Sequence, residues 1–272
     1  MNDDRLEAGF IGAGNMGQAL IAGLVRSGVA PEAIGFAEPA ADRAAALRAQ
    51  FPGLVLLGPR ELAARSRTLV LAVKPQTLPQ LAPDLAAEVT AAQPLVVSVA
   101  AGIPTDRLAG WLGPDTRIVR TMPNTPALIG AGITGLFANP HATATDRETA
   151  DRLLGAVGTT VWLKDEEQMH AVTATSGSGP AYVFLLIEAM TQAAESLGLD
   201  PSTARRLTLA TVAGAARLAG ESGTEPAELR ARVTSPGGTT ERAIAVFEEA
   251  GFAALVEKAM RGAAARSREL GG

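Results

Sequence analysis

The sequence contains no cysteine, and this absence removes several classes of site at once. A disulfide scaffold, a thiolate nucleophile and a cysteine metal site are all excluded, and we expect no metal cofactor. Aromatic residues make up only 4% of the 272 residues, so the core must be built from Ala, Leu, Val and Ile. Because these side chains are small, we expect closely packed helices within or between chains.

The sequence also lacks a basic block and a long apolar run. Its net charge is −4, whereas nucleic-acid binding draws its affinity from Lys and Arg on phosphates. The longest apolar stretch, 181–187, is far shorter than the roughly 20 residues of a membrane span. The N-terminus is acidic and enters a strand pattern at once, unlike a secretory signal. We therefore expect a cytoplasmic protein with no nucleic-acid or membrane partner.

Short apolar runs alternate with helical patterns from residue 7 to about residue 163. The runs are continuously apolar, which is typical of strands buried on both faces of a parallel sheet. Such an alternation predicts an α/β domain with a doubly wound, Rossmann-type parallel sheet. The expected strands are 8–12, 33–37, 54–57, 68–73, 95–100 and 117–122, with 133–138 and 159–163 extending the sheet.

After Asp165 the pattern becomes almost entirely helical. We therefore predict two domains, a dinucleotide-binding domain over 1–163 and an all-helical domain over 164–272. The expected helices of the second domain are 178–198, 201–220, 226–232, 239–249 and 251–268.

A glycine motif directly follows the first expected strand and opens a helix. Gly12 allows a tight turn, Gly14 lets the backbone approach a pyrophosphate, and Gly17 permits close packing of strand and helix. Together with Asn15 and Met16, these residues form the expected cofactor-binding loop, because a helix N-terminus receives negative charge. The alternative is a tight turn without a ligand.

Glu38 stands at the end of the second expected strand, where an acid can bind the ribose hydroxyls of a dinucleotide. A carboxylate there would repel a 2′-phosphate and favour NADH over NADPH. Arg43, about one helical turn later, could instead pair with that phosphate. Glu38 could also merely lie favourably near the N-terminus of the next helix. The sequence leans slightly to NADH and leaves the choice open.

Further segments carry proline, glycine or small polar residues at the ends of strands and helices, and together they identify a family. The sequence resembles pyrroline-5-carboxylate reductases in "GFIGAGNMGQAL", "AVKPQ", "SVAAGI", "RTMPNTPALIGAG", "SGSGPAYVF" and "SPGGTTERAI". The likeness runs from about residue 7 to residue 268. It implies a dinucleotide-binding domain followed by a helical dimerisation domain, and reduction of 1-pyrroline-5-carboxylate to L-proline with NADPH or NADH. A homodimer, with a larger assembly possible, is the implied partner state.

The resemblance assigns substrate contacts to the loop that opens the helix at 239–249. It implies that Ser235, Thr239 and the backbone N–H groups around Gly237 and Gly238 bind the substrate carboxylate. Thr240 would donate a hydrogen bond near the ring nitrogen and is the one catalytic candidate. A nest of N–H groups at a helix N-terminus suits an anion. The alternative is a plain turn with a helix cap.

The resemblance also implies cofactor contacts on the later strands. Asn124 would lie near the nicotinamide and the substrate, although a turn-forming asparagine is the alternative. The other implied cofactor contacts follow the fourth and fifth strands: Val73, Lys74, Pro75, Ala100 and Ala101.

The implied chemistry needs no strong general acid, because the imine can be protonated in solution and hydride then adds to the C=N carbon. Catalysis would rest on proximity and orientation. This fits a chain with two histidines, of which His141 is expected in a solvated loop and His170 in a surface or packing role.

Three alternatives remain. A β-hydroxyacid dehydrogenase would carry a lysine on the first long helix of the second domain, and 179–198 contains none. A reductase of other cyclic imines and a non-catalytic nucleotide-binding relative are the other two.

Overall fold

A computed structural model of the protein describes residues 5–271, which divide into two compact units. Unit 1 runs up to Ser178 and resumes at Ala263, and unit 2 is Gly179–Gly262. Residues 164–178, which the sequence assigned to the helical domain, lie in unit 1. The chain therefore leaves unit 1 through one helix and returns to it through another.

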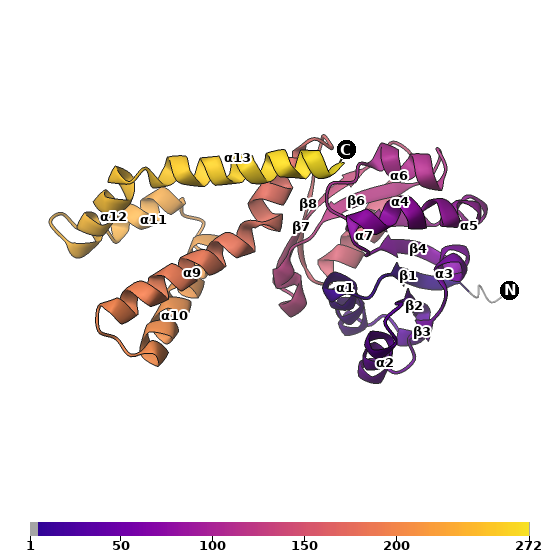
Figure 1. Ribbon diagram of the computed structural model, residues 1–272, viewed down its shortest axis with the longest axis horizontal. Helices are drawn as coiled ribbons and strands as arrows, with labels where there is room; N and C mark the ends of the chain where they lie inside the picture. The colour runs from indigo at the N-terminus through magenta and orange to yellow at the C-terminus, as the bar shows by residue number, and fades with distance from the viewer. Residues whose placement is uncertain (1–4, 272) are drawn as a thin grey trace. The chain divides into compact units, whose positions relative to one another are not determined.

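Unit 1 contains an eight-stranded sheet, and every strand overlaps its predicted range (Figure 1). The strands are β1 (Leu6–Ile11), β2 (Ile34–Ala37), β3 (Val55–Leu56), β4 (Ser66–Leu71), β5 (Leu95–Ser98), β6 (Ile118–Met122), β7 (Gly132–Ala138) and β8 (Gly158–Trp162).

The sheet order is β3-β2-β1-β4-β5-β6-β7-β8, so the chain winds outward from β1 in two opposite directions. All neighbouring pairs are parallel except β6–β7, which is antiparallel. The doubly wound fold is thus confirmed, with one antiparallel pair that the apolar runs did not predict. In such a sheet, ligands bind outside the carboxyl ends of the strands, where the order reverses. Here that point lies between β1 and β4.

Two apolar cores cover the two faces of the sheet, because neighbouring residues of a strand point to opposite faces. Phe10 contributes to the core that contains Leu20 of α1, and the next residue, Ile11, contributes to the core that contains Leu108 of α6. The α-helices of unit 1 before Ser178 are α1 (Asn15–Arg26), α2 (Ala41–Gln50), α3 (Pro59–Arg65), α4 (Leu78–Leu81), α5 (Ala86–Ala92), α6 (Thr105–Leu112), α7 (Ala144–Gly155) and α8 (Gln168–Val172). The short 3₁₀ turns are η1 (Pro31–Ala33), η2 (Pro75–Thr77), η3 (Pro83–Leu85) and η4 (Thr125–Ile129), and a π-helical turn, η5 (Thr173–Gly177), precedes unit 2.

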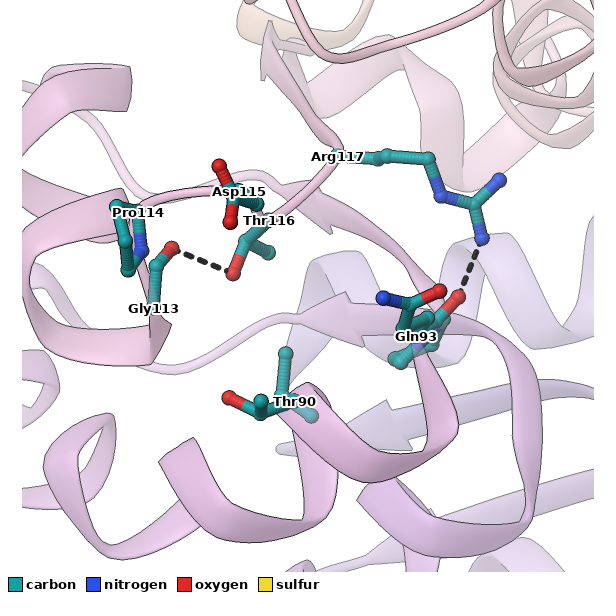
Figure 2. A pocket seen from close by; sticks show the side chains of 9 residues that line it. Thr90, Gln93, Gly113, Pro114, Asp115, Thr116 and Arg117 are labelled. Carbon is teal, nitrogen blue, oxygen red and sulfur yellow. Dashed lines mark hydrogen bonds between the residues drawn. The ribbon is translucent and has the colours of Figure 1, made fainter.

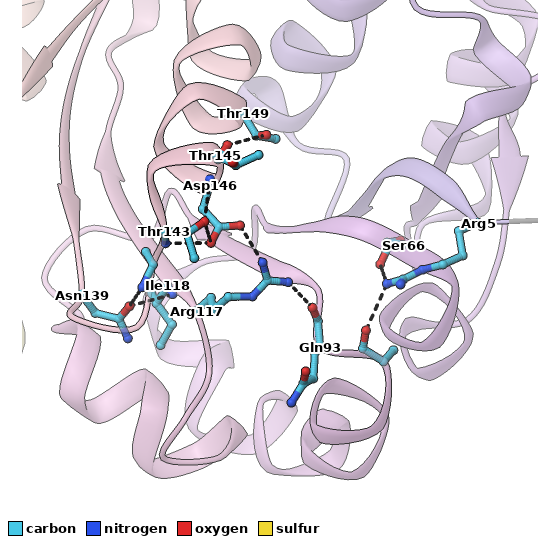
Figure 3. A network of polar contacts seen from close by, with 12 residues as sticks. Arg5, Ser66, Gln93, Arg117, Ile118, Asn139, Thr143, Thr145, Asp146 and Thr149 are labelled. Atoms are coloured by element: carbon cyan, nitrogen blue, oxygen red, sulfur yellow. Dashed lines mark hydrogen bonds and ion pairs between the residues drawn. The ribbon is translucent and has the colours of Figure 1, made fainter. Parts of the chain in front are cut away.

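A polar network fixes the amino-terminal edge of the sheet (Figure 3). The Arg117 guanidinium lies 2.8 Å from Asp146, whose other carboxylate oxygen accepts from the amide and hydroxyl of Thr143 at the start of α7. Asn139 accepts from the amide of Ile118 at 3.0 Å. Because these bonds connect β6, the turn after β7 and α7, they hold the antiparallel pair in register.

Unit 2 is entirely helical, as predicted. Asp200 caps the second helix by accepting from the Ser202 hydroxyl and from the amides of Ser202 and Thr203. Hydrogen bonds from Ser202, with the hydroxyl first, and from Thr203 lower the pKa of the Asp200 carboxyl to about 2. The helices are α9 (Gly179–Ser196), α10 (Pro201–Glu221), α11 (Pro226–Arg232), α12 (Thr239–Glu249) and α13 (Phe252–Gly271), the last of which continues into unit 1. Within residues 5–271 no helix combines the length and the apolar character that a membrane span requires.

Candidate active site

The three glycines of the first motif have three different physical requirements. Gly12 adopts φ +99°, and a Cβ there would lie 2.6 Å from the Ala72 carbonyl oxygen. A Cβ on Gly17 would overlap the Gly12 carbonyl oxygen. In contrast, a Cβ on Gly14 would meet no heavy atom of the described chain within 4 Å, its chain neighbours aside. Gly12 and Gly17 are thus required by the fold, while Gly14 borders open space.

Gly14 is the N-cap of α1, and no side chain among the described residues caps this helix. Its first-turn N–H groups have no intrahelical partner, and the helix dipole places positive charge at this end. Asn15 is exposed and Met16 is half-buried against the core. An uncapped N-terminus beside an open glycine fits the pyrophosphate of a dinucleotide. The described residues of this loop are therefore suited to the cofactor that the sequence predicts.

Glu38 is held more firmly than the sequence indicated. One carboxylate oxygen accepts from the Ala13 amide at 3.0 Å, and the other accepts from the Ala40 amide at 3.0 Å. Arg43, which is half-exposed, lies 3.2 Å from the same carboxylate, and the Glu38 side chain is only 4% exposed. The acid therefore links the glycine loop to the start of α2, and it already has an ion-pair partner.

The other predicted cofactor contacts on unit 1 lie at the same carboxyl edge. Val73 and Lys74 follow β4, and Pro75 begins η2; Lys74 is exposed. Ala100 is 3% exposed and Ala101 is half-buried in the turn after β5. Strand β4 pairs with both β1 and β5, so these turns flank the glycine loop along one edge.

Asn124 ends the extended segment after β6 and is 9% exposed. Its side-chain oxygen accepts from the Ile133 amide at 3.0 Å, which ties the turn η4 to β7. Its oxygen atom therefore has the role that the turn-forming alternative assigns to this residue.

The second glycine segment, 235–240, forms the start of α12 in unit 2. Gly237 has φ +70° and Gly238 is the N-cap, where a Cβ would lie 2.8 Å from the Ser235 hydroxyl. Both expected N–H groups have partners within this unit. The Gly238 amide donates to the Ser235 carbonyl at 3.0 Å, and the Gly237 amide donates to the Glu241 carboxylate at 2.8 Å. Thr239 is exposed and Thr240 is half-buried.

These bonds change which donors of the loop are free for an anion. Of the N–H groups expected around Gly237 and Gly238 to bind the anion, those of the two glycines themselves already donate within the loop. Helix α12 has no side-chain cap among the described residues, so its first-turn amides, beginning at Thr239 and Thr240, are the donors without an intrahelical partner. Glu241 was missed by the sequence reasoning, although an acid three residues after an N-cap is a recognised helix-start signal.

The two histidines are placed as expected. His141 is exposed in the loop before α7. His170 is buried, and its Nδ1 lies 2.9 Å from the Ser267 hydroxyl. Burial lowers the pKa of His170 below its usual value of 6.5.

A partly open pocket of about 140 Å³ lies at the opposite edge of the sheet from the glycine loop (Figure 2). Its walls come from the ends of α5 and α6 and from the residues just before β5 and β6, including Thr90, Asp115 and Arg117. Because this is the amino-terminal edge of the strands, the pocket is separate from the predicted cofactor edge.

Two family models match the chain. The model described as pyrroline-5-carboxylate reductase dimerisation matches residues 166–270, and the model described as NADP oxidoreductase coenzyme F420-dependent matches residues 7–102. The first of these begins close to the predicted start of the helical domain, ahead of the boundary between the compact units.

Similar proteins cover almost the whole chain. A pyrroline-5-carboxylate reductase of Pseudomonas aeruginosa is 51% identical over 96% of this chain and 95% of its own length. The solved structure of a pyrroline-5-carboxylate reductase from Coxiella burnetii is 40% identical, has a TM-score of 0.92, and is matched over 98% of this chain and 99% of that one. A pyrroline carboxylate reductase structure from Plasmodium falciparum, with NADP bound, is 27% identical with a TM-score of 0.87 and covers 99% of both chains.

Proposed function

The chain belongs to the pyrroline-5-carboxylate reductase family, and we infer that it reduces 1-pyrroline-5-carboxylate to L-proline with NAD(P)H as the final step of proline biosynthesis. The structural observation that supports this function is the start of α1 without a side-chain cap beside Gly14, whose open side leaves room for the pyrophosphate of a dinucleotide. The absence of lysine from 179–198 disfavours the β-hydroxyacid dehydrogenase alternative.

We propose that unit 1 orients the cofactor through the ends of its central strands. The amides at the start of α1 bind the pyrophosphate, and the turns that follow β4, β5 and β6 bind the ribose and nicotinamide. The bound dinucleotide supplies the hydride. Ala100 and Ala101 have small side chains that leave room for a planar ring, and the Asn124 amide nitrogen is available to donate to its carboxamide.

We propose that the start of α12 binds the substrate carboxylate. The donors are the amides of Thr239 and Thr240 together with the hydroxyl groups of Ser235 and Thr239, since the amides of Gly237 and Gly238 already have partners. Thr240 donates near the ring nitrogen and orients the imine for hydride addition. The proton of the iminium comes from solution, so no residue of the chain needs to act as a strong acid.

Glu38 bears on the choice between NADH and NADPH. Its carboxylate is buried and already accepts from two backbone N–H groups and contacts Arg43, which limits its capacity to accept from a ribose hydroxyl. Arg43 neutralises it and is itself half-exposed, which favours tolerance of a 2′-phosphate. The relative from Plasmodium falciparum binds NADP. We propose that this enzyme accepts both dinucleotides, and the earlier lean to NADH stays a prediction.

We propose that the enzyme is a cytoplasmic homodimer assembled through its helical unit. Helix α9 exposes large apolar side chains, among them Phe184 at 62% and Leu185 at 66%, which a second copy would cover. The matched dimerisation family supports this assembly. A larger ring of dimers would bury further apolar area in the same way.

Steady-state reduction of 1-pyrroline-5-carboxylate, with NADH and NADPH compared, tests the function. Wild type should turn over, and Thr240→Ala should lose rate while its dissociation constant for the dinucleotide stays unchanged. Thr239→Ser, which keeps the hydroxyl and the helix start, is the matched control and should retain most of the rate. Dinucleotide binding without turnover of this imine by wild type would overturn the substrate assignment and leave the fold assignment intact.

A further inference from the structure

The C-terminal end of α13 packs within unit 1, and no step of the proposed reaction explains this packing. Residues from Ala263 onward belong to unit 1, although the helix begins in unit 2. Ser267 is only 3% exposed and Gly271 is buried. A helix end that were merely a solvated tail would not bury polar and backbone groups in this way.

Polar contacts tie this helix end to the region around α8. The Ser267 hydroxyl lies 2.9 Å from Nδ1 of His170. The Arg268 guanidinium donates to the Glu167 carboxylate at 2.6 Å. Because Glu167 and His170 lie just after β8, these contacts fix the helix end against the sheet-bearing unit at two points.

A third tie connects the helix end to α6. The Arg107 guanidinium donates to the Gly271 carbonyl oxygen at 2.7 Å, which also satisfies a terminal carbonyl of α13. Figure 1 shows this end of α13 beside α6. The helix end therefore lies against the segment that leads from β5 into α6.

Within that segment, Gly102 makes a close backbone contact with Gly271 of α13. A Cβ on Gly271 would lie 2.5 Å from the Gly102 carbonyl oxygen, and a Cβ on Gly102 would lie 3.1 Å from the Leu270 Cβ. Gly102 also has φ +83°, a conformation that residues with side chains rarely adopt. The turn after β5 is thus shaped for direct contact with the end of α13. Gly102 immediately follows Ala100 and Ala101.

We propose that residues 267–271 are a positioning element for the turn 99–102, and that they fix the surface on which the nicotinamide ring binds. The inference rests on the proposed function in taking Ala100 and Ala101 as nicotinamide contacts. The helix end touches no reacting atom and acts only through the turn. The adenine half of the cofactor does not depend on it, because the Gly12 turn packs against Ala72 after β4.

Gly271→Ala tests the proposal because the added methyl group would press directly on the Gly102 carbonyl oxygen. Alanine otherwise favours helix, so the helix itself should persist. Gly155→Ala is the matched control: Gly155 also ends its helix, and a Cβ there would meet no described heavy atom within 4 Å. A second variant, Ser267→Ala, removes the contact with His170 without adding volume.

The measurement compares complete dinucleotides with fragments that lack nicotinamide, by titration calorimetry on the full chain. We expect the dissociation constants of NADPH and NADH to rise about threefold to tenfold in Gly271→Ala, the effect of one or two weakened contacts. Adenosine 2′,5′-bisphosphate and ADP should bind as in wild type. Hydrogen exchange of the amides in 99–105 should accelerate in Gly271→Ala and Ser267→Ala but not in Gly155→Ala.

Two results would overturn the proposal. Equal weakening of whole dinucleotides and fragments would indicate a general structural defect, and unchanged affinity for NADPH and NADH in both variants would show that the turn does not depend on the helix end. Failure of the proposed function is distinguishable, because wild type would then leave the imine unreduced while the binding comparison could still be read.

Discussion

Exchange of Gly14 and Gly17 for alanine should separate binding from stability within one motif. In Gly14→Ala the new methyl group enters open space, and the residue keeps an extended N-cap conformation with φ −71° and ψ −172°. An alanine N-cap costs only about 0.5 kcal/mol at the low end of measured caps. In Gly17→Ala the methyl group would overlap the Gly12 carbonyl oxygen, and such overpacking costs about 1–3 kcal/mol.

Affinity for the cofactor should fall mainly in Gly14→Ala, the variant that loses little stability. The methyl group of Gly14→Ala occupies the side from which a pyrophosphate approaches, and loss of one hydrogen bond to a charged group is worth about 1.5–3 kcal/mol. This loss corresponds to a dissociation constant about tenfold to a hundredfold higher. Thermal unfolding without ligand and fluorescence titration with NADPH measure the two effects separately. If Gly14→Ala bound NADPH as wild type does, or lost as much stability as Gly17→Ala, the assignment of Gly14 to the ligand would be refuted.

Three further outcomes can be tested. Arg120→Met should lower the free energy of unfolding by about 2 kcal/mol in urea titrations. This is less than the loss expected for a fully buried ion pair, because the partner Glu166 is 21% exposed. An unchanged urea midpoint would contradict this expectation. Glu241→Gln keeps an acceptor for the Gly237 amide but removes a negative charge beside the carboxylate site, so KM for the imine should fall severalfold at low salt; a higher KM would mean that the charge itself holds the loop. Burial lowers the pKa of His170, so the free energy of unfolding should decrease as the pH falls through 6.5, because the unfolded chain takes up the proton first. In His170→Gln this decrease should be smaller. An equal decrease in the variant would assign the pH dependence to other groups.

Strands and helices were predictable because their signals are local. Each of the short apolar runs expected as strands between residues 8 and 163 overlaps a strand, and the break at Asp200-Pro201 is a capped helix start. The antiparallel pairing of β7 with β6 was not predictable from apolar runs, since a buried strand carries the same pattern in either direction. The sequence also did not predict how the chain divides into compact units, because one continuous helix, α13, belongs to unit 2 over its first half and to unit 1 from Ala263 onward.

The sequence predicts which segments form the candidate site, but it does not predict which polar atoms of those segments remain free. The carboxyl-edge location of Gly14 and Ala100 follows from strand order and motif spacing. The partners of individual donors do not, because they depend on tertiary geometry. Asn124 uses its oxygen for the Ile133 amide, and the Gly237 amide is taken by Glu241. A sequence names the donors in a loop, whereas the fold decides which of them remain free.

The two glycine loops solve the same physical problem in a similar way. In each, a carboxylate accepts a hydrogen bond from an amide next to the helix start: Glu38, which follows β2, accepts from Ala13, and Glu241, in the first turn of α12 itself, accepts from Gly237. An acid in this position fixes the loop, because the bond to a charged acceptor is strong. At the anion sites proposed for these loops, it would also place a negative charge near the ligand and so weaken its binding. In this proposal each loop exchanges some affinity for a preformed shape, and the first-turn amides of α1 and α12 make the binding contacts.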